Sequence, residues 1–314
     1  MDLTVWTSTT IHGRPIFDPA LERWSISLKK ETKCSGNGKT TEKTNNSEMI
    51  IETIYPRHII LATGQAGAPR IPDFPGLEKF KGEIMHSSAF SGSPRYSGKN
   101  VIVVGCGNSA HDIAMELYEQ EAGRVTLVQR SSTYVMSRDF GVKKVFCGLH
   151  DEDGLPTDDA DLFNASFPFL SAIPIRRHLT SEVAKHDREM LASLEAVGFK
   201  VDYGYEGTGF MLKYLLASGG CYIDVGCCKL IADCKIHLKH GSVKEFVEDG
   251  IIFEDSTKLE AEVVVLATGF LSMRETARSI FGDEVADRIQ DVWGLADDGE
   301  ISGMWQRITL SDLY

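Results

Sequence analysis

The chain has 314 residues, enough for two domains of ordinary size. Hydrophobic residues make up 42% and charged residues 25%, as in folded soluble proteins. The formal net charge of −12 argues against a binder of nucleic acid or of anionic membrane surfaces. No apolar run approaches the ~20 residues of a membrane span, and the N-terminus shows no secretory leader. We therefore expect a cytoplasmic protein.

Seven cysteines are spread along the chain without a C-x-x-C pair: Cys34, Cys106, Cys147, Cys221, Cys227, Cys228 and Cys234. Four of them lie within residues 221–234, but their spacing fits no familiar zinc pattern. That segment has the pattern of a strand followed by a helix. We expect reduced thiols and no metal site.

The first 64 residues have the pattern of a β-meander. Strand character is found in four stretches, residues 3–11, 23–29, 49–55 and 57–64. Residues 31–48 are polar and contain glycine and asparagine, which indicates a hairpin loop. The fourth stretch, RHIILATG, is a continuous apolar run, as a strand buried on both faces requires, and it ends in the small residues Thr63 and Gly64.

Residues 65–100 are punctuated by proline and glycine and are expected to be mostly loop. The next residues, VIVVGCGNSAH, form a short apolar strand that enters the pattern Gly105-x-Gly107-x-x-Ala110, and a helical pattern follows. Gly105 allows a tight bend, Gly107 lets the backbone approach a pyrophosphate, and Ala110 lets the helix pack on the strand. The sequence therefore predicts a phosphate site at this turn.

A second strand, RVTLVQRSS, starts at Arg124 with the spacing of a βαβ unit. In such a unit, residues at the end of the second strand contact the adenosine ribose, and an Asp or Glu there would bind the 2′-hydroxyl of NAD. The residues at this position are Gln129, Arg130, Ser131 and Ser132. Since Arg130 can form forked, charge-assisted hydrogen bonds to a 2′-phosphate, the pattern predicts NADPH rather than NADH. The alternative is a surface arginine at a strand end.

The rest of the chain mixes helical and strand patterns. Residues 155–200 carry helix signals, and KIHLK and GIIFED have strand character. Residues 262–270, EVVVLATGF, form a second continuous apolar run that ends in Thr268 and Gly269. Each Ala-Thr-Gly run alone is consistent with a buried strand that ends in a turn. As a pair on either side of a dinucleotide motif, they indicate two passages of the chain close to a bound group.

A further pattern, Phe80-x-Gly82-x-x-x-His86-x-x-x-Phe90, precedes the glycine turn. It resembles the identifying motif of flavin-containing monooxygenases. The two Ala-Thr-Gly runs resemble the two domain crossings of that family. The segments DYG, GTGF, KYLL and YIDVG resemble a fungal branch that is similar to YUCCA-type enzymes. The resemblance covers nearly the whole chain, to about Arg307.

The resemblance implies an α/β fold in which a Rossmann-like NADPH-binding domain with a parallel sheet is inserted in a partial FAD-binding domain that carries the β-meander. The implied domains are 1–80 with 262–314 for FAD, and 81–261 for NADPH, with a helical insert at about 140–200. It also implies an oxidoreductase in which NADPH reduces the flavin and one oxygen of O2 enters a small N-, S- or carbonyl-containing substrate, as in N,N-dimethylaniline monooxygenases. In such enzymes the protein positions the cofactors and excludes water.

The motif match also implies roles for single residues. The NADPH pyrophosphate would be held by Gly105, Gly107, Asn108, Ser109 and Ala110. The 2′-phosphate would be held by Arg130 and Ser131. The linker between the domains would be shaped by Phe80, Gly82, His86 and Phe90. The domain crossing would lie near Thr63, Gly64, Thr268 and Gly269. His86 is a candidate general base, although a single histidine is more often structural, and no catalytic residue is assigned.

The sequence departs from the family pattern at both ends. The family opens with its own glycine turn for the FAD pyrophosphate, whereas no G-x-G-x-x-G precedes residue 101 here. Near the C-terminus, ITLSDLY replaces the final flavin-contacting segment. Two interpretations stay open at this point. One is a monooxygenase truncated at both ends, and the other is a non-catalytic or partner-dependent NADPH-binding fragment.

Overall fold

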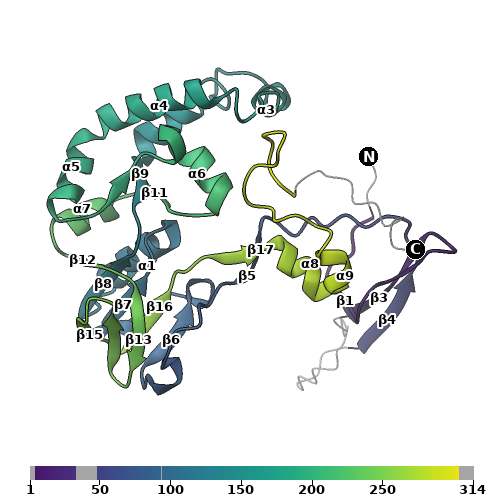
Figure 1. Ribbon diagram of the computed structural model, residues 1–314, viewed down its shortest axis with the longest axis horizontal. Helices are drawn as coiled ribbons and strands as arrows, with labels where there is room; N and C mark the ends of the chain where they lie inside the picture. Colours follow the sequence, from purple (N-terminus) through teal and green to yellow (C-terminus); the bar gives the residue numbers. More distant parts are fainter. Residues whose placement is uncertain (1–3, 33–47, 93, 304–314) are drawn as a thin grey trace, which may run out of the picture. The chain divides into compact units, whose positions relative to one another are not determined.

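The computed structural model describes residues 4–32, 48–92 and 94–303. The chain divides into two compact units (Figure 1). Unit 1 comprises residues 1–68, 271–292 and 303–314, and unit 2 comprises residues 69–270 and 293–302. The sequence-based boundaries were placed at residues 80 and 262, and the assignment of one cofactor to each domain stays a prediction.

Unit 1 is built on a small antiparallel sheet. Its strands are β1 (Thr9–Ile11), β2 (Ile16–Asp18), β3 (Arg23–Thr32) and β4 (Glu48–Ile54). The long strand β3 pairs antiparallel with each of the other three. Along β3, the buried Trp24 and Ile26 alternate with the half-buried Ser25 and Ser27, so one face of the sheet is apolar.

This apolar face packs against a helix from a distant part of the sequence. Unit 1 also contains α8 (Met273–Phe281) and α9 (Asp283–Ala286). Trp24 and Ile26 form a buried cluster with Ala277 and Phe281 of α8. The rings of Trp24 and Phe281 lie edge to face, with their centroids 5.4 Å apart. The core of unit 1 therefore joins the first and last thirds of the chain.

The expected β-meander is only partly present. Strand character at 3–11 is reduced to β1, β2 was not expected, and residues 57–64 form no strand, which corrects the sequence-based assignment. Ile60, in the middle of that apolar run, is 86% exposed. An apolar run becomes a strand only when a neighbouring strand pairs with its backbone, and the described residues offer none there. The expected hairpin loop at 31–48 lies mostly outside the described residues.

Unit 2 is centred on a five-stranded parallel sheet of order β12-β8-β7-β16-β6. Its strands are β6 (Glu83–His86), β7 (Asn100–Val104), β8 (Arg124–Gln129), β12 (His237–His240) and β16 (Val263–Leu266). The runs VIVV and VVVL are buried throughout, as strands covered on both faces must be. This confirms the parallel sheet. Strand β6 lies in a stretch that was expected to be mostly loop, because a four-residue strand with one β-branched residue, Ile84, gives little signal.

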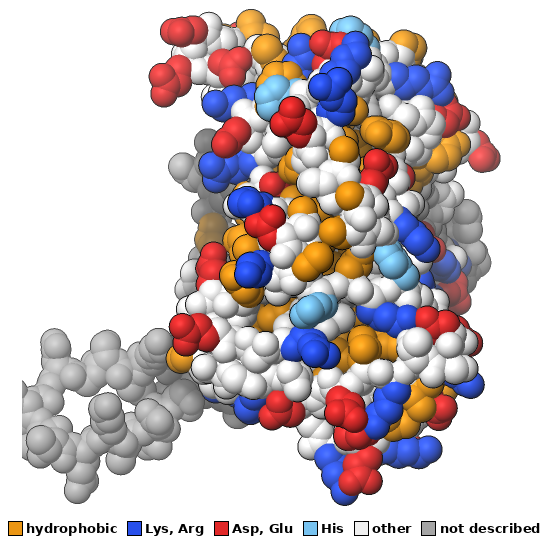
Figure 2. Space-filling view, turned by 90° about the vertical axis from the view of Figure 1, so that its left-hand side faces the viewer, with side chains coloured by type: hydrophobic (Ala, Val, Ile, Leu, Met, Phe, Trp, Pro, Cys, Tyr) orange, Lys and Arg blue, Asp and Glu red, His pale blue; other side chains and the backbone are white. Residues whose placement is uncertain are grey.

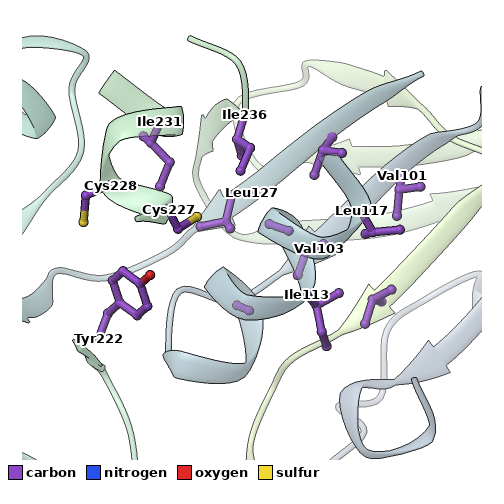
Figure 3. Packing of buried hydrophobic residues seen from close by; sticks show 14 of the residues in the cluster. Val101, Val103, Ile113, Leu117, Leu127, Tyr222, Cys227, Cys228, Ile231 and Ile236 are labelled. Carbon is purple, nitrogen blue, oxygen red and sulfur yellow. The ribbon is translucent and has the colours of Figure 1, made fainter. Parts of the chain in front are cut away.

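Helices cover one face of this sheet and a second, antiparallel sheet covers the other. On the first face, Ile113 and Leu117 of α1 (Asn108–Glu119) pack over Val101 and Val103 of β7 (Figure 3). Helices α5 (Arg188–Ala196) and α7 (Cys227–Ala232) contribute to the same cluster. The opposite face is covered by β13 (Val243–Val247), β14 (Gly250–Phe253) and β15 (Lys258–Glu260). Each fully buried aliphatic side chain in these layers contributes about 1.5–3 kcal/mol.

The helical signals at 155–200 correspond to α3 (Thr157–Ala165), α4 (Ile173–His186) and α5. The remaining elements of unit 2 are β9 (Thr133–Ser137), β10 (Val201–Asp202), β11 (Cys221–Asp224), α2 (Lys143–Val145) and α6 (Phe210–Ala217), with short 3₁₀ or π turns at 77–79, 87–89, 94–96, 138–142 and 205–207. Strands β10, β9 and β11 form a second parallel sheet. The prediction of a strand followed by a helix at 221–234 is confirmed by β11 and α7.

The passages between the units contain β5 (Ala66–Pro69) and β17 (Phe270–Ser272). Within the described residues, no helix combines the length and the apolar character that crossing a bilayer requires. Figure 2 shows one face of the molecule, on which acidic and basic side chains are interspersed with scattered apolar ones. Such a mixture is ordinary for a folded protein surface.

Candidate dinucleotide-binding site

The first glycine of the turn is required by the backbone. Gly105 follows β7 directly and has a φ of 129°, a conformation that side chains with a Cβ rarely adopt. A Cβ at this position would overlap the carbonyl oxygen of Ala267, just beyond β16. The N–H of Gly105 donates to the carbonyl of Val128 in β8 at 3.0 Å. The turn is therefore held at the carboxyl ends of three neighbouring strands.

The second glycine is not required by the protein itself. Gly107 has φ −92° and ψ −174°, an extended conformation open to any residue. A Cβ on Gly107 would meet no protein atom nearer than the carbonyl oxygen of Cys221, at 3.9 Å. The face above Gly107 is therefore open, and a side chain there would fill it.

Free backbone donors surround this open face. Gly107 is the N-cap of α1, and within the described residues the N–H groups of Gly107, Asn108 and Ser109 donate to no protein acceptor. Unpaired amides and the positive end of a 12-residue helix together favour an anion. The chemistry of this donor set therefore fits a pyrophosphate.

Other residues of the motif anchor the helix instead of facing the open side. Ala110 is fully buried against the sheet. The side-chain oxygen of Asn108 accepts a hydrogen bond from the N–H of Ile223 in β11 at 2.9 Å. The backbone N–H of Asn108 is therefore the group left for a ligand, while its side-chain amide ties the turn to the second parallel sheet. Ser109 is exposed beside it.

A buried histidine supports the turn from below. Nδ1 of His111 lies 3.0 Å from the carbonyl oxygen of Gly107, so it must carry the proton and donate. The ring stacks on Tyr222 with the centroids 3.9 Å apart, and Nε2 has no partner among the described residues. Burial lowers the pKa of His111 to about 4, and the hydrogen bond to Gly107 opposes this only in part. His111 is therefore neutral near pH 7.

The far end of the site is formed where β8 ends. Gln129 is fully buried, and its amide makes two hydrogen bonds to the backbone of Lys200, at 2.9 Å to the carbonyl and 2.8 Å from the N–H. Gln129 is therefore structural. Arg130 and Ser131 are exposed, and within the described residues the guanidinium of Arg130 has no hydrogen-bond or ion-pair partner. A cation that no carboxylate neutralises is available to a ligand.

The Phe80–Phe90 motif lies wholly in unit 2, along the β6 edge of the sheet. Phe80 is buried and packs edge to face against Phe246, at 6.0 Å between centroids. A Cβ on Gly82 would overlap both the Glu262 carbonyl and the ring of Phe80, which explains the glycine. Phe90 stacks on Tyr96 at 6.0 Å. These residues shape the sheet edge, while their role as a linker between domains stays a prediction.

His86, the candidate general base, has both ring nitrogens engaged. Nδ1 accepts from the N–H of Ser88 at 3.2 Å, so Nε2 carries the proton and donates to the carbonyl of Gly269 at 2.9 Å. The ring is buried and packs edge to face on Phe270. This arrangement favours a structural role, in which His86 holds the end of β6 to the segment after β16.

The two Ala-Thr-Gly runs belong to different units. Thr63 and Gly64 are exposed residues of unit 1. Thr268 and Gly269 follow β16 in unit 2, where the Thr268 hydroxyl donates to the carbonyl of Arg70 at 2.5 Å and the N–H of Arg70 donates to Gly269 at 2.9 Å. The second run therefore lies at the carboxyl end of the parallel strands, as the glycine turn does.

Sequence reasoning missed His111 and Lys200. The signal for His111 was a polar residue on the buried face of a helix, directly after the glycine motif. Lys200 had no local signal, because 71 residues separate it from Gln129, which holds it. Only the folded chain brings them together.

The parallel sheet, with a glycine turn between its central strand and a helix, defines a fold of the Rossmann type. Residues 22–146 match the family model described as flavin-binding monooxygenase-like. The chain is 30% identical to indole-3-pyruvate monooxygenase YUCCA1 of Oryza sativa over 224 residues, 70% of this chain and 48% of the relative. It is 29% identical to human flavin-containing monooxygenase 2 over 239 residues, 75% of this chain and 39% of the relative. This chain belongs to the flavin-containing monooxygenase family and spans about half, or less, of these curated relatives.

Solved structures with a similar fold carry related names. One is the OTEMO complex with FAD and NADP, with a TM-score of 0.56 and 18% identity over 87% of this chain and 54% of that chain. Another is the polycyclic ketone monooxygenase of Thermothelomyces thermophila, with a TM-score of 0.51 and 17% identity over 93% of this chain and 51% of that chain. At this identity the likeness establishes the fold, and it confirms the α/β architecture expected from the sequence.

Proposed function

We propose that this chain provides the NADPH-binding part of an FAD- and NADPH-dependent monooxygenase. The turn at Gly107 carries this proposal, because it combines an open face, three free N–H groups and the start of α1. In this site, Gly107, Asn108 and Ser109 would bind the pyrophosphate through their backbone. Gly105 and Ala110 would hold the turn and the helix in place.

The preference for NADPH rests on the end of β8. Arg130 stands exposed where the adenosine ribose is read in this fold, and no Asp or Glu occupies the neighbouring positions 129–132. A guanidinium attracts the 2′-phosphate, and Ser131 can add a hydroxyl donor. The carboxylate that would favour NAD is replaced by a cation.

Bound NADPH would supply the reducing equivalents for the flavin of the whole enzyme. Relatives named indole-3-pyruvate monooxygenase and dimethylaniline monooxygenase (N-oxide-forming) support a small N-, S- or carbonyl-containing substrate, with O2 as the second substrate. This chain's own residues bind and orient the dinucleotide. We assign no catalytic residue, since both ring nitrogens of His86 are engaged in hydrogen bonds. We propose a cytoplasmic location for the protein, in keeping with its acidic composition.

The described residues of unit 1 do not match an FAD pyrophosphate site. They contain an antiparallel sheet and two helices, and neither α8 nor α9 follows a glycine turn at the end of a parallel strand. We therefore derive no step through FAD on this chain. Binding of FAD belongs to the proposal for the whole protein.

Two measurements test the proposal. Isothermal titration of the purified chain should give a lower Kd for NADP+ than for NAD+. Arg130→Asp should remove that preference by weakening NADP+ far more than NAD+, and equal affinities in the wild type would contradict the role of Arg130. The visible spectrum reports flavin. A colourless chain that still prefers NADP+ would support the second interpretation, an NADPH-binding fragment that needs a partner for flavin chemistry.

A further inference from the structure

The backbone of a second cationic residue, Lys200, is held at the end of β8, where Arg130 follows. The side-chain amide of Gln129 donates to the carbonyl of Lys200 and accepts from its N–H. The N–H of Thr133 also donates to the carbonyl of Lys200, at 2.9 Å. Lys200 is thus tied both to the residue before Arg130 and to the first residue of β9. The exposed turn at 130–132 and Lys200 are therefore neighbours at the carboxyl end of the sheet.

The charge of Lys200 acts at this same end of the sheet. His240 lies at the end of β12, opposite Gln129 in the strand register. Burial and, after it, the positive charge of Lys200 lower the pKa of His240. Lys200 therefore adds positive charge at the end of β12, beside the end of β8.

Neither cation is neutralised by another group in the described part of the chain. Two other lysines nearby are paired with carboxylates, Lys213 with Asp202 and Lys239 with Asp255. In contrast, the exposed side chain of Lys200 makes no hydrogen bond or ion pair in the described part of the chain, and the same holds for Arg130. Two exposed cations at the same end of the sheet, with no carboxylate to neutralise them among the described residues, offer positive charge to an anion.

We propose that Lys200 is a second specificity-determining residue, which binds the 2′-phosphate of NADPH together with Arg130, and that Gln129 sets their spacing. This inference rests on the proposed function. The guanidinium provides directed hydrogen bonds, and the ammonium provides a compact second charge, as suits a phosphate dianion. NAD lacks this group, so Lys200 should not affect its binding.

The test compares Lys200→Met with Lys235→Met in the 314-residue chain. Methionine keeps most of the aliphatic stem and removes the charge. Lys235 is an exposed lysine of the same unit that lies two residues before β12, at the amino end of that strand, whereas the proposed site lies at the carboxyl end. Isothermal titration with NADP+, NAD+, 2′,5′-ADP and 5′-AMP gives four Kd values for each variant. Lys200→Met should weaken NADP+ and 2′,5′-ADP about tenfold, and NAD+ and 5′-AMP less than about twofold, whereas Lys235→Met should change none of them.

The outcomes separate this inference from the proposed function. If the wild type prefers NADP+ and Lys200→Met keeps that preference unchanged, Lys200 has no such role and the proposed function stands. If Lys200→Met weakens NADP+ and NAD+ equally, Lys200 acts on the fold and not on the 2′-phosphate, which also overturns the assignment. A wild type that binds no NADP+ would overturn the proposed function and this inference together.

Discussion

The neutral, buried His111 should make the stability of the chain depend on pH in a defined way. The perturbation is a shift from about pH 7.5 to about pH 5, applied to the wild type and to His111→Phe. Phenylalanine retains a ring that can stack on Tyr222, but it has no group that titrates. The Gly107 carbonyl keeps two other donors, the N–H groups of residues 110 and 111, at 3.1 and 3.2 Å.

The sign follows from the direction of the pKa shift. The pKa of His111 is about 4 in the folded chain and 6.5 in the unfolded chain, so the unfolded state takes up a proton first. Its contribution is complete above pH 6.5 and is lost as the pH falls towards 4. A displacement of this size reduces the free energy of unfolding by about 2 kcal/mol at pH 5, relative to neutral pH.

Urea unfolding, followed by far-ultraviolet circular dichroism at a series of pH values, measures this loss. The difference between the two proteins isolates His111, since the carboxylates titrate in both. At about pH 7.5 the two should differ by no more than ~1 kcal/mol, because one hydrogen bond is lost and one unpartnered nitrogen is removed. By about pH 5, the wild type should have lost about 2 kcal/mol relative to His111→Phe. Parallel pH profiles for the two proteins would refute the reasoning.

Three further predictions follow from the geometry. Gly107→Ala should change the free energy of unfolding by no more than ~1 kcal/mol, since the added Cβ overlaps no atom of the described residues. The same variant should raise the Kd for NADP+ at least about tenfold, because the Cβ enters the open face proposed for the pyrophosphate. Gly105→Ala should lower the free energy of unfolding by more than ~2 kcal/mol, as measured by urea unfolding. In a timed reaction with iodoacetamide followed by peptide mass spectrometry, the exposed Cys147 and Cys234 should react before the cysteines whose pKa burial raises, Cys106, Cys221, Cys227 and Cys228. His86→Ala should destabilise the chain by about 2 kcal/mol in urea unfolding without changing the NADP+ Kd, because its ring holds two chain segments together.

Each of these predictions has a result that contradicts it. Unchanged NADP+ affinity in Gly107→Ala would mean that the pyrophosphate does not approach this face. Early labelling of Cys227 or Cys228 would show that α7 opens readily. A large rise in the NADP+ Kd of His86→Ala at unchanged stability would mean that His86 contributes to NADP+ binding and is not only structural.

The glycine turn was predictable because its determinants are local. A strand, Gly105, Gly107, Ala110 and a helical pattern stand within a short stretch of sequence, and the structure places each of them as expected. The apolar runs VIVV and VVVL likewise identified strands covered on both faces. The run RHIILATG has the same local pattern but forms no strand. A strand needs a pairing partner, which the local sequence does not reveal.

The sequence by itself determined the glycine turn, the cationic end of β8 and the membership in a flavin monooxygenase family. Only the tertiary structure decided which polar groups are free. It satisfied both ring nitrogens of His86, buried His111 in its neutral form beneath Gly107, and used Gln129 to bring Lys200 beside Arg130. These outcomes depend on contacts between segments far apart in the chain, where burial and hydrogen-bond partners, and not residue type, set the charge and availability of each group.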